Sequence, residues 1–157
     1  MAFNKHINDK QALLYWDAFR DNIFASTTID KSETLEDQKK RIAHLEANPE
    51  EWFVYYFPKY CTAKPAKFHI AATKRWLKNN RWYEVRAWSR ELSKSTRAMF
   101  EDLYLLLTKK SKYKVLISFS ADQAVKLFMP YMINLESNQR IIHDYGRQRK
   151  IGKLECR

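Results

Sequence analysis

Glycine, the residue that tolerates the positive φ angles of tight turns, occurs only twice in these 157 residues, as Gly146 and Gly152. Because hairpin turns depend heavily on glycine, this scarcity disfavours a turn-rich all-β fold. Hydrophobic residues make up 45% of the chain, which supplies material for a packed core. We therefore expect a helical or α/β protein, and the length corresponds to about one domain.

The first half of the chain carries apolar residues at helical spacing. Residues 9–24 form a one-sided apolar stripe, and residues 34–48 form a mostly charged helix with a thin apolar side. These two helices predict a helical amino-terminal region over residues 1–48. A second region is predicted over residues 49–157.

Two more helices open the second region. Asn48-Pro49 is a strong helix start, because Asn caps the first turn and Pro fits its first position. The short aromatic helix that follows is stopped by Pro58, and its aromatic side chains suit a helical core better than base stacking. Residues 66–80 predict a further helix with one apolar side.

From residue 81 the periodicity changes. Residues 81–88 alternate as a strand does, and residues 112–120 have the continuous apolar centre of a buried strand. A long helix over 95–110 lies between them, a helix over 121–137 follows, and residues 139–146 read as a short third strand. The order strand, helix, strand, helix is typical of a parallel α/β sheet.

Local signals refine the last long helix. Ser120 and Gln123 have the spacing of a capping box. Pro130 lies within the helix and predicts a kink or an early end.

The turn before the helix at 95–110 reads SRELSKST and covers residues 89–96. A phosphate-binding loop needs backbone N–H groups, a lysine for the outer phosphates and a hydroxyl for Mg²⁺. Lys94 and Ser95 supply the last two, whereas Trp88 and Ser93 stand where the two glycines of the usual pattern would be. A non-glycine residue at positive φ costs about 1–2 kcal/mol, which the small Ser93 can bear. Trp88 fits only if its side chain turns away from the phosphates. A charged helix start without a ligand remains the alternative.

Charge is distributed unevenly along the chain, whose formal net charge is +11. Residues 1–50 hold 7 Lys and Arg against 9 Asp and Glu, whereas residues 51–157 hold 22 against 9. A basic half of this kind indicates a polyanion, either nucleic acid or nucleotide phosphate, although a merely solvated basic surface gives the same pattern. The basic segments 108–114 and 147–150 could contact DNA phosphates or be an ordinary loop and tail.

The cysteines and the chain's amino terminus bear on its compartment. Cys61 and Cys156 have neither metal-ligand spacing nor a disulfide framework, which favours a reducing, intracellular environment. Neither an export signal nor an apolar run of about 20 residues is visible. We therefore expect a soluble cytoplasmic protein without a membrane partner.

The order of these segments resembles the ATPase motor of the large terminase subunit of tailed bacteriophages. The resemblance covers about residues 50–150 and rests on KFHIAATKRWLKNNRW, then SRELSKST, then KVLISFSADQAVKLFMPYMINLESNQRIIHDYG. In that family the first glycine of the loop is often absent and a basic residue precedes the lysine, as Arg90 does here. The resemblance implies a helical lead-in followed by a partial P-loop NTPase sheet.

Roles for individual residues follow from the same resemblance. It implies that Lys94 neutralises the β- and γ-phosphates of Mg-ATP, Ser95 holds Mg²⁺, and Arg90 lies near the γ-phosphate, so that Lys94 and Arg90 are the catalytic candidates. The implied nucleotide-binding residues are Ser89, Arg90, Glu91, Leu92, Ser93, Lys94, Ser95 and Thr96. His69 could lie near the adenine, although a packing role suits it better.

The resemblance also sets limits and partners. The acidic strand end that organises Mg²⁺ in these motors, and the aspartates of their nuclease domain, have no counterpart among the acids after residue 110. The implied protein is thus the amino-terminal part of a phage or prophage terminase, acting in the bacterial cytoplasm with double-stranded DNA, the small terminase subunit and the portal, and inactive as an ATPase by itself. The alternative is a non-catalytic basic module with a degenerate loop that binds nucleic acid or a partner subunit.

Overall fold

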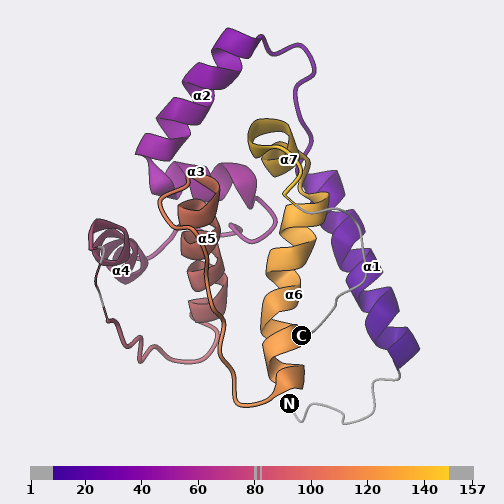
Figure 1. Ribbon diagram of the computed structural model, residues 1–157, viewed down its shortest axis with the longest axis vertical. Helices are drawn as coiled ribbons and strands as arrows, with labels where there is room; N and C mark the ends of the chain where they lie inside the picture. Colours follow the sequence, from indigo (N-terminus) through magenta and orange to yellow (C-terminus); the bar gives the residue numbers. More distant parts are fainter. Residues whose placement is uncertain (1–8, 80, 82, 149–157) are drawn as a thin grey trace.

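Helices make up all the regular structure in the described part of this protein. The computed structural model describes residues 9–79, 81 and 83–148, so Trp82, Cys156 and most of the predicted basic tail lie outside the described residues. The helices are α1 (Asp9–Ser26), α2 (Leu35–Ala47), α3 (Pro49–Tyr56), α4 (Lys67–Lys78), α5 (Lys94–Leu107), α6 (Ala121–Ser137) and α7 (Gln139–Tyr145). Figure 1 shows α1 beside α6, with α2 projecting at the top above α3.

The predicted parallel α/β sheet, and with it the partial P-loop NTPase fold, is wrong. The described residues contain no strand: the segments predicted as strands at 81–88 and 112–120 form neither helix nor strand where they are described, and residues 139–145 form α7. Alternating side chains favour an extended backbone, but an extended backbone becomes a strand only when a neighbour supplies its hydrogen bonds. In α7 the side chain of Asn138 accepts a hydrogen bond from the backbone N–H of Ile141, at 3.1 Å, which starts a helix instead.

The helices predicted from apolar spacing are confirmed, with small differences at their ends. Ser120 caps α6 by accepting a hydrogen bond from the backbone N–H of Gln123. Asn48 stands before α3, but its amide donates to the carbonyl of His44 instead of capping the helix. Pro130 does not end α6, which continues to Ser137.

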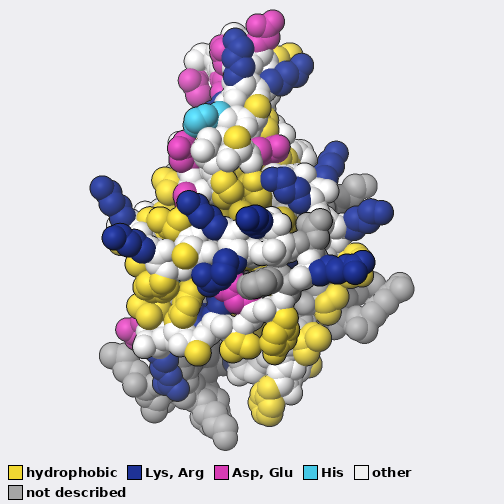
Figure 2. Space-filling model, turned by 90° about the vertical axis from the view of Figure 1, so that its left-hand side faces the viewer, with side chains coloured by type: hydrophobic (Ala, Val, Ile, Leu, Met, Phe, Trp, Pro, Cys, Tyr) yellow, Lys and Arg dark blue, Asp and Glu magenta, His cyan; other side chains and the backbone are white. Residues whose placement is uncertain are grey.

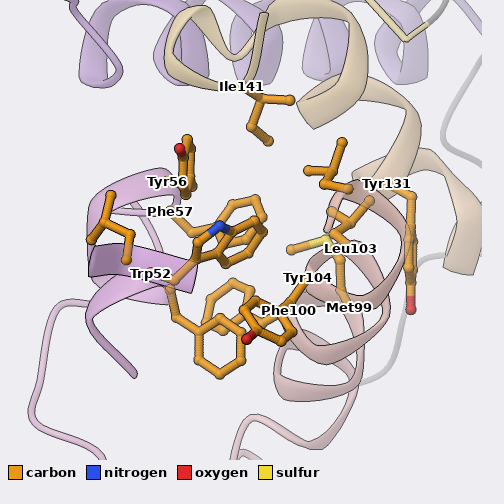
Figure 3. Packing of buried hydrophobic residues seen from close by; sticks show 12 residues of the cluster. Trp52, Tyr56, Phe57, Met99, Phe100, Leu103, Tyr104, Tyr131 and Ile141 are labelled. Carbon is orange, nitrogen blue, oxygen red and sulfur yellow. The ribbon is translucent and has the colours of Figure 1, made fainter. Parts of the chain in front are cut away.

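An aromatic cluster between α3 and α5 forms the centre of the core. Figure 3 shows the two helices facing each other there, with Tyr131 of α6 and Ile141 of α7 at the edges. The rings of Phe57 and Phe100 stack at 4.7 Å between centroids. The sequence favoured a core role over base stacking for the aromatic residues of α3 and the residue after it. That prediction is confirmed for those that are buried, which are Trp52, Phe53, Tyr56 and Phe57.

A polar cluster fastens α2 and α7 to this core. The carboxylate of Asp144, fully buried, accepts hydrogen bonds from Arg41 at 2.7 and 2.9 Å and from the Tyr56 hydroxyl at 2.6 Å. Arg41 is shared with Glu33. Burial by itself would raise the pKa of Asp144, but the hydrogen bonds from Arg41, Tyr56 and Gln38 outweigh it and lower that pKa to about 2.

None of the helices in the described part of the chain is long and apolar enough to cross a membrane.

Candidate functional site

The loop that connects the extended segment at 83–88 to α5 has an unusual backbone. Glu91 and Ser93 both adopt positive φ angles, of 65° and 53°. The left-handed conformation costs a non-glycine residue about 1–2 kcal/mol, and such strain is most frequent at functional sites. Ser93 thus takes the left-handed turn that the sequence pattern required of it, and Glu91 takes a second one.

Lys94 folds back over this loop. Its ammonium group donates hydrogen bonds to the backbone carbonyls of Trp88 and Ser89, the latter at 2.8 Å. These two carbonyls belong to the start of the loop, so the lysine closes the loop into a ring at the first turn of α5.

The start of α5 lacks the usual side-chain cap. Ser93 stands in the capping position without capping through its hydroxyl, and the first turn contains no acidic residue. In the part of the chain that the structure describes, neither the Ser95 nor the Thr96 hydroxyl makes a hydrogen bond. The first N–H groups of α5 and the positive end of its dipole therefore remain available to an anion.

A hollow of about 520 Å³ lies next to this helix start. Residues of α4, α5 and both extended segments line it, among them Trp76, Arg86, Lys94, Ser95 and Lys114. It therefore combines an aromatic wall with three cationic side chains.

Two of these cations are already neutralised. Arg86 pairs with Glu101 at 2.8 Å and with Glu84 at 3.1 Å, and Lys114 pairs with Asp102 at 3.2 Å. Lys94 differs, because its partners among the described residues are backbone carbonyls and not a carboxylate. Its charge is the one most available to a bound anion.

A buried polar network holds α4 and α5 in register beneath the loop. The Thr73 hydroxyl donates to Glu101 at 2.6 Å and accepts from Arg97 at 3.0 Å. Arg97 also pairs with Glu50 of α3. Burial raises the pKa of Glu101, while its hydrogen bonds with Thr73 and Arg86 oppose that shift.

His69 and Trp88 support the loop from the side of α4. His69 Nε2 lies 3.1 Å from the Leu92 carbonyl, which can only accept, and Nδ1 accepts from the Ala66 N–H at 3.1 Å. Both ring nitrogens are therefore engaged, which favours the packing role for this histidine over contact with a base. The Trp88 indole packs against Phe68 and His69, so its side chain turns toward α4 and its carbonyl toward Lys94.

The structure brings the predicted loop residues together and adds others. Arg90, Glu91 and Leu92 are exposed on the outside of the loop. Among the described residues Arg90 has no ion pair. Sequence reasoning missed Trp76, Arg86 and Lys114, because their approach to Lys94 depends on how the extended segments pack on α5. The alternation of Arg86 and Lys114 with apolar neighbours was the available signal.

The donor set fits Mg²⁺ only together with a nucleotide. The described residues contain no group of three or more His, Cys, Asp or Glu side chains able to hold a metal ion. The Ser95 hydroxyl at the edge of the hollow is an oxygen ligand of the type Mg²⁺ prefers, and this ion is normally held by phosphates and water with one or two protein oxygens.

Comparisons of the chain with protein-family models, curated proteins and solved structures gave no match.

Proposed function

We propose that the loop at residues 88–96 binds the phosphates of Mg-ATP, and that the chain is the nucleotide-binding part of a viral DNA-packaging motor of the terminase type. The observation that carries the proposal is the Lys94 ammonium, held over the Trp88 and Ser89 carbonyls at a helix start without a side-chain cap. The resemblance of the ordered segments to terminase motors supports it. The lack of a sheet in the described chain means that the proposal rests on the loop and not on a P-loop fold.

Each part of the loop has a role in this proposal. A triphosphate would replace the carbonyls as partner of Lys94, while the N–H groups at the start of α5 would hold phosphate oxygens. Ser95 would hold Mg²⁺, which neutralises phosphate charge when bound. Arg90, exposed and without an ion pair among the described residues, would approach the γ-phosphate. The motor would work in a bacterial host cell with double-stranded DNA, the small subunit and the portal.

Calorimetric titration of the purified chain with Mg-ATP tests the proposal, alongside Lys94→Ala. The matched control is Lys74→Ala, which removes an exposed lysine of α4 and leaves the loop intact. We expect saturable binding to the wild type and to the control, and a loss of about tenfold or more for Lys94→Ala, since a charged hydrogen bond contributes about 1.5–3 kcal/mol. Circular dichroism of each variant checks that its helices are retained. Absence of binding at millimolar nucleotide, or equal binding by Lys94→Ala, would refute the proposal.

The second candidate is a non-catalytic basic module that binds nucleic acid. Figure 2 shows Lys and Arg side chains spread over the middle of one face, whereas acidic side chains gather toward the end formed by α2. Such a face suits a phosphate backbone, and binding would then weaken steeply with salt. A fluorescently labelled DNA duplex measured at two salt concentrations separates the candidates: binding that is strong, salt-dependent and unchanged in Lys94→Ala, in a chain that does not bind nucleotide, favours this one.

A further inference from the structure

Two extended segments of the chain, 83–88 and 112–119, turn their apolar side chains outward. Six large apolar residues on them are each at least 69% exposed: Tyr83, Val85, Tyr113, Val115, Ile117 and Phe119. The residues that alternate with them and face inward include the charged Arg86 and Lys114. This arrangement inverts the usual distribution, and contiguous exposed apolar surface marks an interaction site.

The inward cations anchor both segments to the same side of α5. Arg86 pairs with Glu101 and Lys114 with the adjacent Asp102. Both cations also lie over the Trp76 ring, at 5.9 and 5.3 Å from its centroid. The segments thus flank one hollow, the one of about 520 Å³ whose far end holds Lys94.

The two segments run in the same direction. On the first, Arg86 lies beside Glu101 in the middle of α5, and the carbonyl of Trp88 lies beside Lys94 at its start. On the second, Lys110 lies beside Tyr104, and Lys114, further along the chain, lies beside Asp102, which comes earlier in α5. Each segment therefore runs against α5, and in Figure 1 the second segment descends from the upper end of α5 past its lower end.

Part of the backbone in each segment has no backbone partner in the portion of the chain that the structure describes. Of the described residues, 85–88 and 113–119 make no backbone-to-backbone hydrogen bond. An extended stretch with an unpaired backbone is a template for the addition of another strand.

We propose that the hollow between the two segments binds an extended segment of an acidic polypeptide partner, which pairs with their backbone and covers the exposed apolar row. The unpaired backbone favours a partner in an extended conformation. The outward apolar side chains favour a partner with apolar residues at every second position, or with an apolar surface beside its extended segment. Charge selects the acidic character, because the chain carries a net charge of +11 and its second segment begins next to Lys109, Lys110 and Lys112. The same charge opposes pairing with a second copy of this chain.

The test uses the full chain and a labelled peptide of about nine residues in which valine alternates with glutamate. Two versions carry N-methyl groups on alternate residues, one on the odd and one on the even positions, so that each lacks the backbone donors of one edge. A third replaces glutamate by lysine. We expect saturable binding of the acidic peptide by fluorescence anisotropy, and a loss of about tenfold or more for at least one N-methylated version and for the lysine version.

Variants of the chain locate the site. Ile117→Glu adds a negative charge to the exposed apolar row and should weaken the binding of the acidic peptide about tenfold. Its matched control is Leu35→Glu, which changes an exposed leucine on α2 and should leave binding unchanged. Ile117 lies outside the loop, so Ile117→Glu should bind Mg-ATP as the wild type does, and failure of this proposal and failure of nucleotide binding are separate results.

Three results would overturn the proposal. The first is no saturable binding of the acidic peptide at millimolar concentration. The second is binding of both N-methylated versions as tight as that of the unmodified peptide, because backbone pairing would then contribute nothing. The third is a stable dimer in sedimentation that Ile117→Glu dissociates, which would make a second copy the occupant.

Discussion

Replacing Asp144 with Asn would remove the charge that joins α2, α3 and α7. The Asp144 side chain is fully buried, and its carboxylate accepts hydrogen bonds from Arg41, Tyr56 and Gln38. Asn keeps the shape of Asp, but its NH₂ group can only donate hydrogen bonds, and the side chains around it are themselves donors. Arg41 would keep its pair with Glu33.

The expected cost can be worked out from the shifted pKa. A carboxylate whose pKa falls from 3.8 to about 2 on folding contributes about 2.5 kcal/mol to the free energy of unfolding at neutral pH. Removing one partner of a buried ion pair costs about 3–5 kcal/mol in other proteins. We expect Asp144→Asn to lower the free energy of unfolding by about 3 kcal/mol at pH 7.

The pH dependence follows from the sign of the shift. Because folding lowers this pKa, the stabilisation is complete above about pH 5 and is lost as the pH falls toward 2. Urea unfolding monitored by tryptophan fluorescence should therefore show the difference between wild type and variant shrinking over this range. The control is Asp17→Asn, which breaks an exposed pair with Arg20 and should change stability by less than about 0.5 kcal/mol. A difference below about 1 kcal/mol at pH 7, or one that stays constant down to pH 2.5, would refute the reasoning.

Three further substitutions test the core, the loop and the network beneath it, each by chemical denaturation. Leu103→Ala should cost about 2–5 kcal/mol because the side chain is fully buried, whereas the same change at exposed Leu35 should cost less than about 0.5; similar costs at the two sites would contradict the core described here. Ser93→Val should cost about 2 kcal/mol, since a branched side chain at positive φ is strained, and an unchanged stability would argue against the left-handed turn. Thr73→Val should cost about 1–3 kcal/mol by leaving buried Glu101 short of a donor, and a gain in stability would show that the network is not formed.

Local signals in the sequence predicted the helices well. Apolar spacing located α1, α2, α4, α5 and α6 to within a few residues, because a helix makes its hydrogen bonds within one segment. Capping succeeded at Ser120 and failed at Asn48, whose amide reaches the carbonyl of His44 one turn earlier. The competition between two nearby backbone partners is not visible in the residue types.

In the candidate site, too, the sequence predicted some residues and missed others. The sequence marked Ser93 as the residue that must take a left-handed turn and Lys94 as the loop lysine, and both follow from residues within the loop itself. Trp76, Arg86 and Lys114 border the same hollow, but they come from three segments that only packing brings together. Their pairing with Glu101 and Asp102 could not be read from spacing.

What the sequence by itself determined is therefore everything that depends on neighbours along the chain: the long helices, the aromatic segment around Trp52 and the polar loop before α5. The tertiary structure decided the rest. Among the described residues it left 85–88 and 113–119 without backbone-to-backbone hydrogen bonds, because a strand needs such bonds from another segment and alternation of side chains cannot supply them. It also placed their charged residues against α5, where nearby carboxylates compensate the cost of burying the cations and the apolar side chains are left facing solvent.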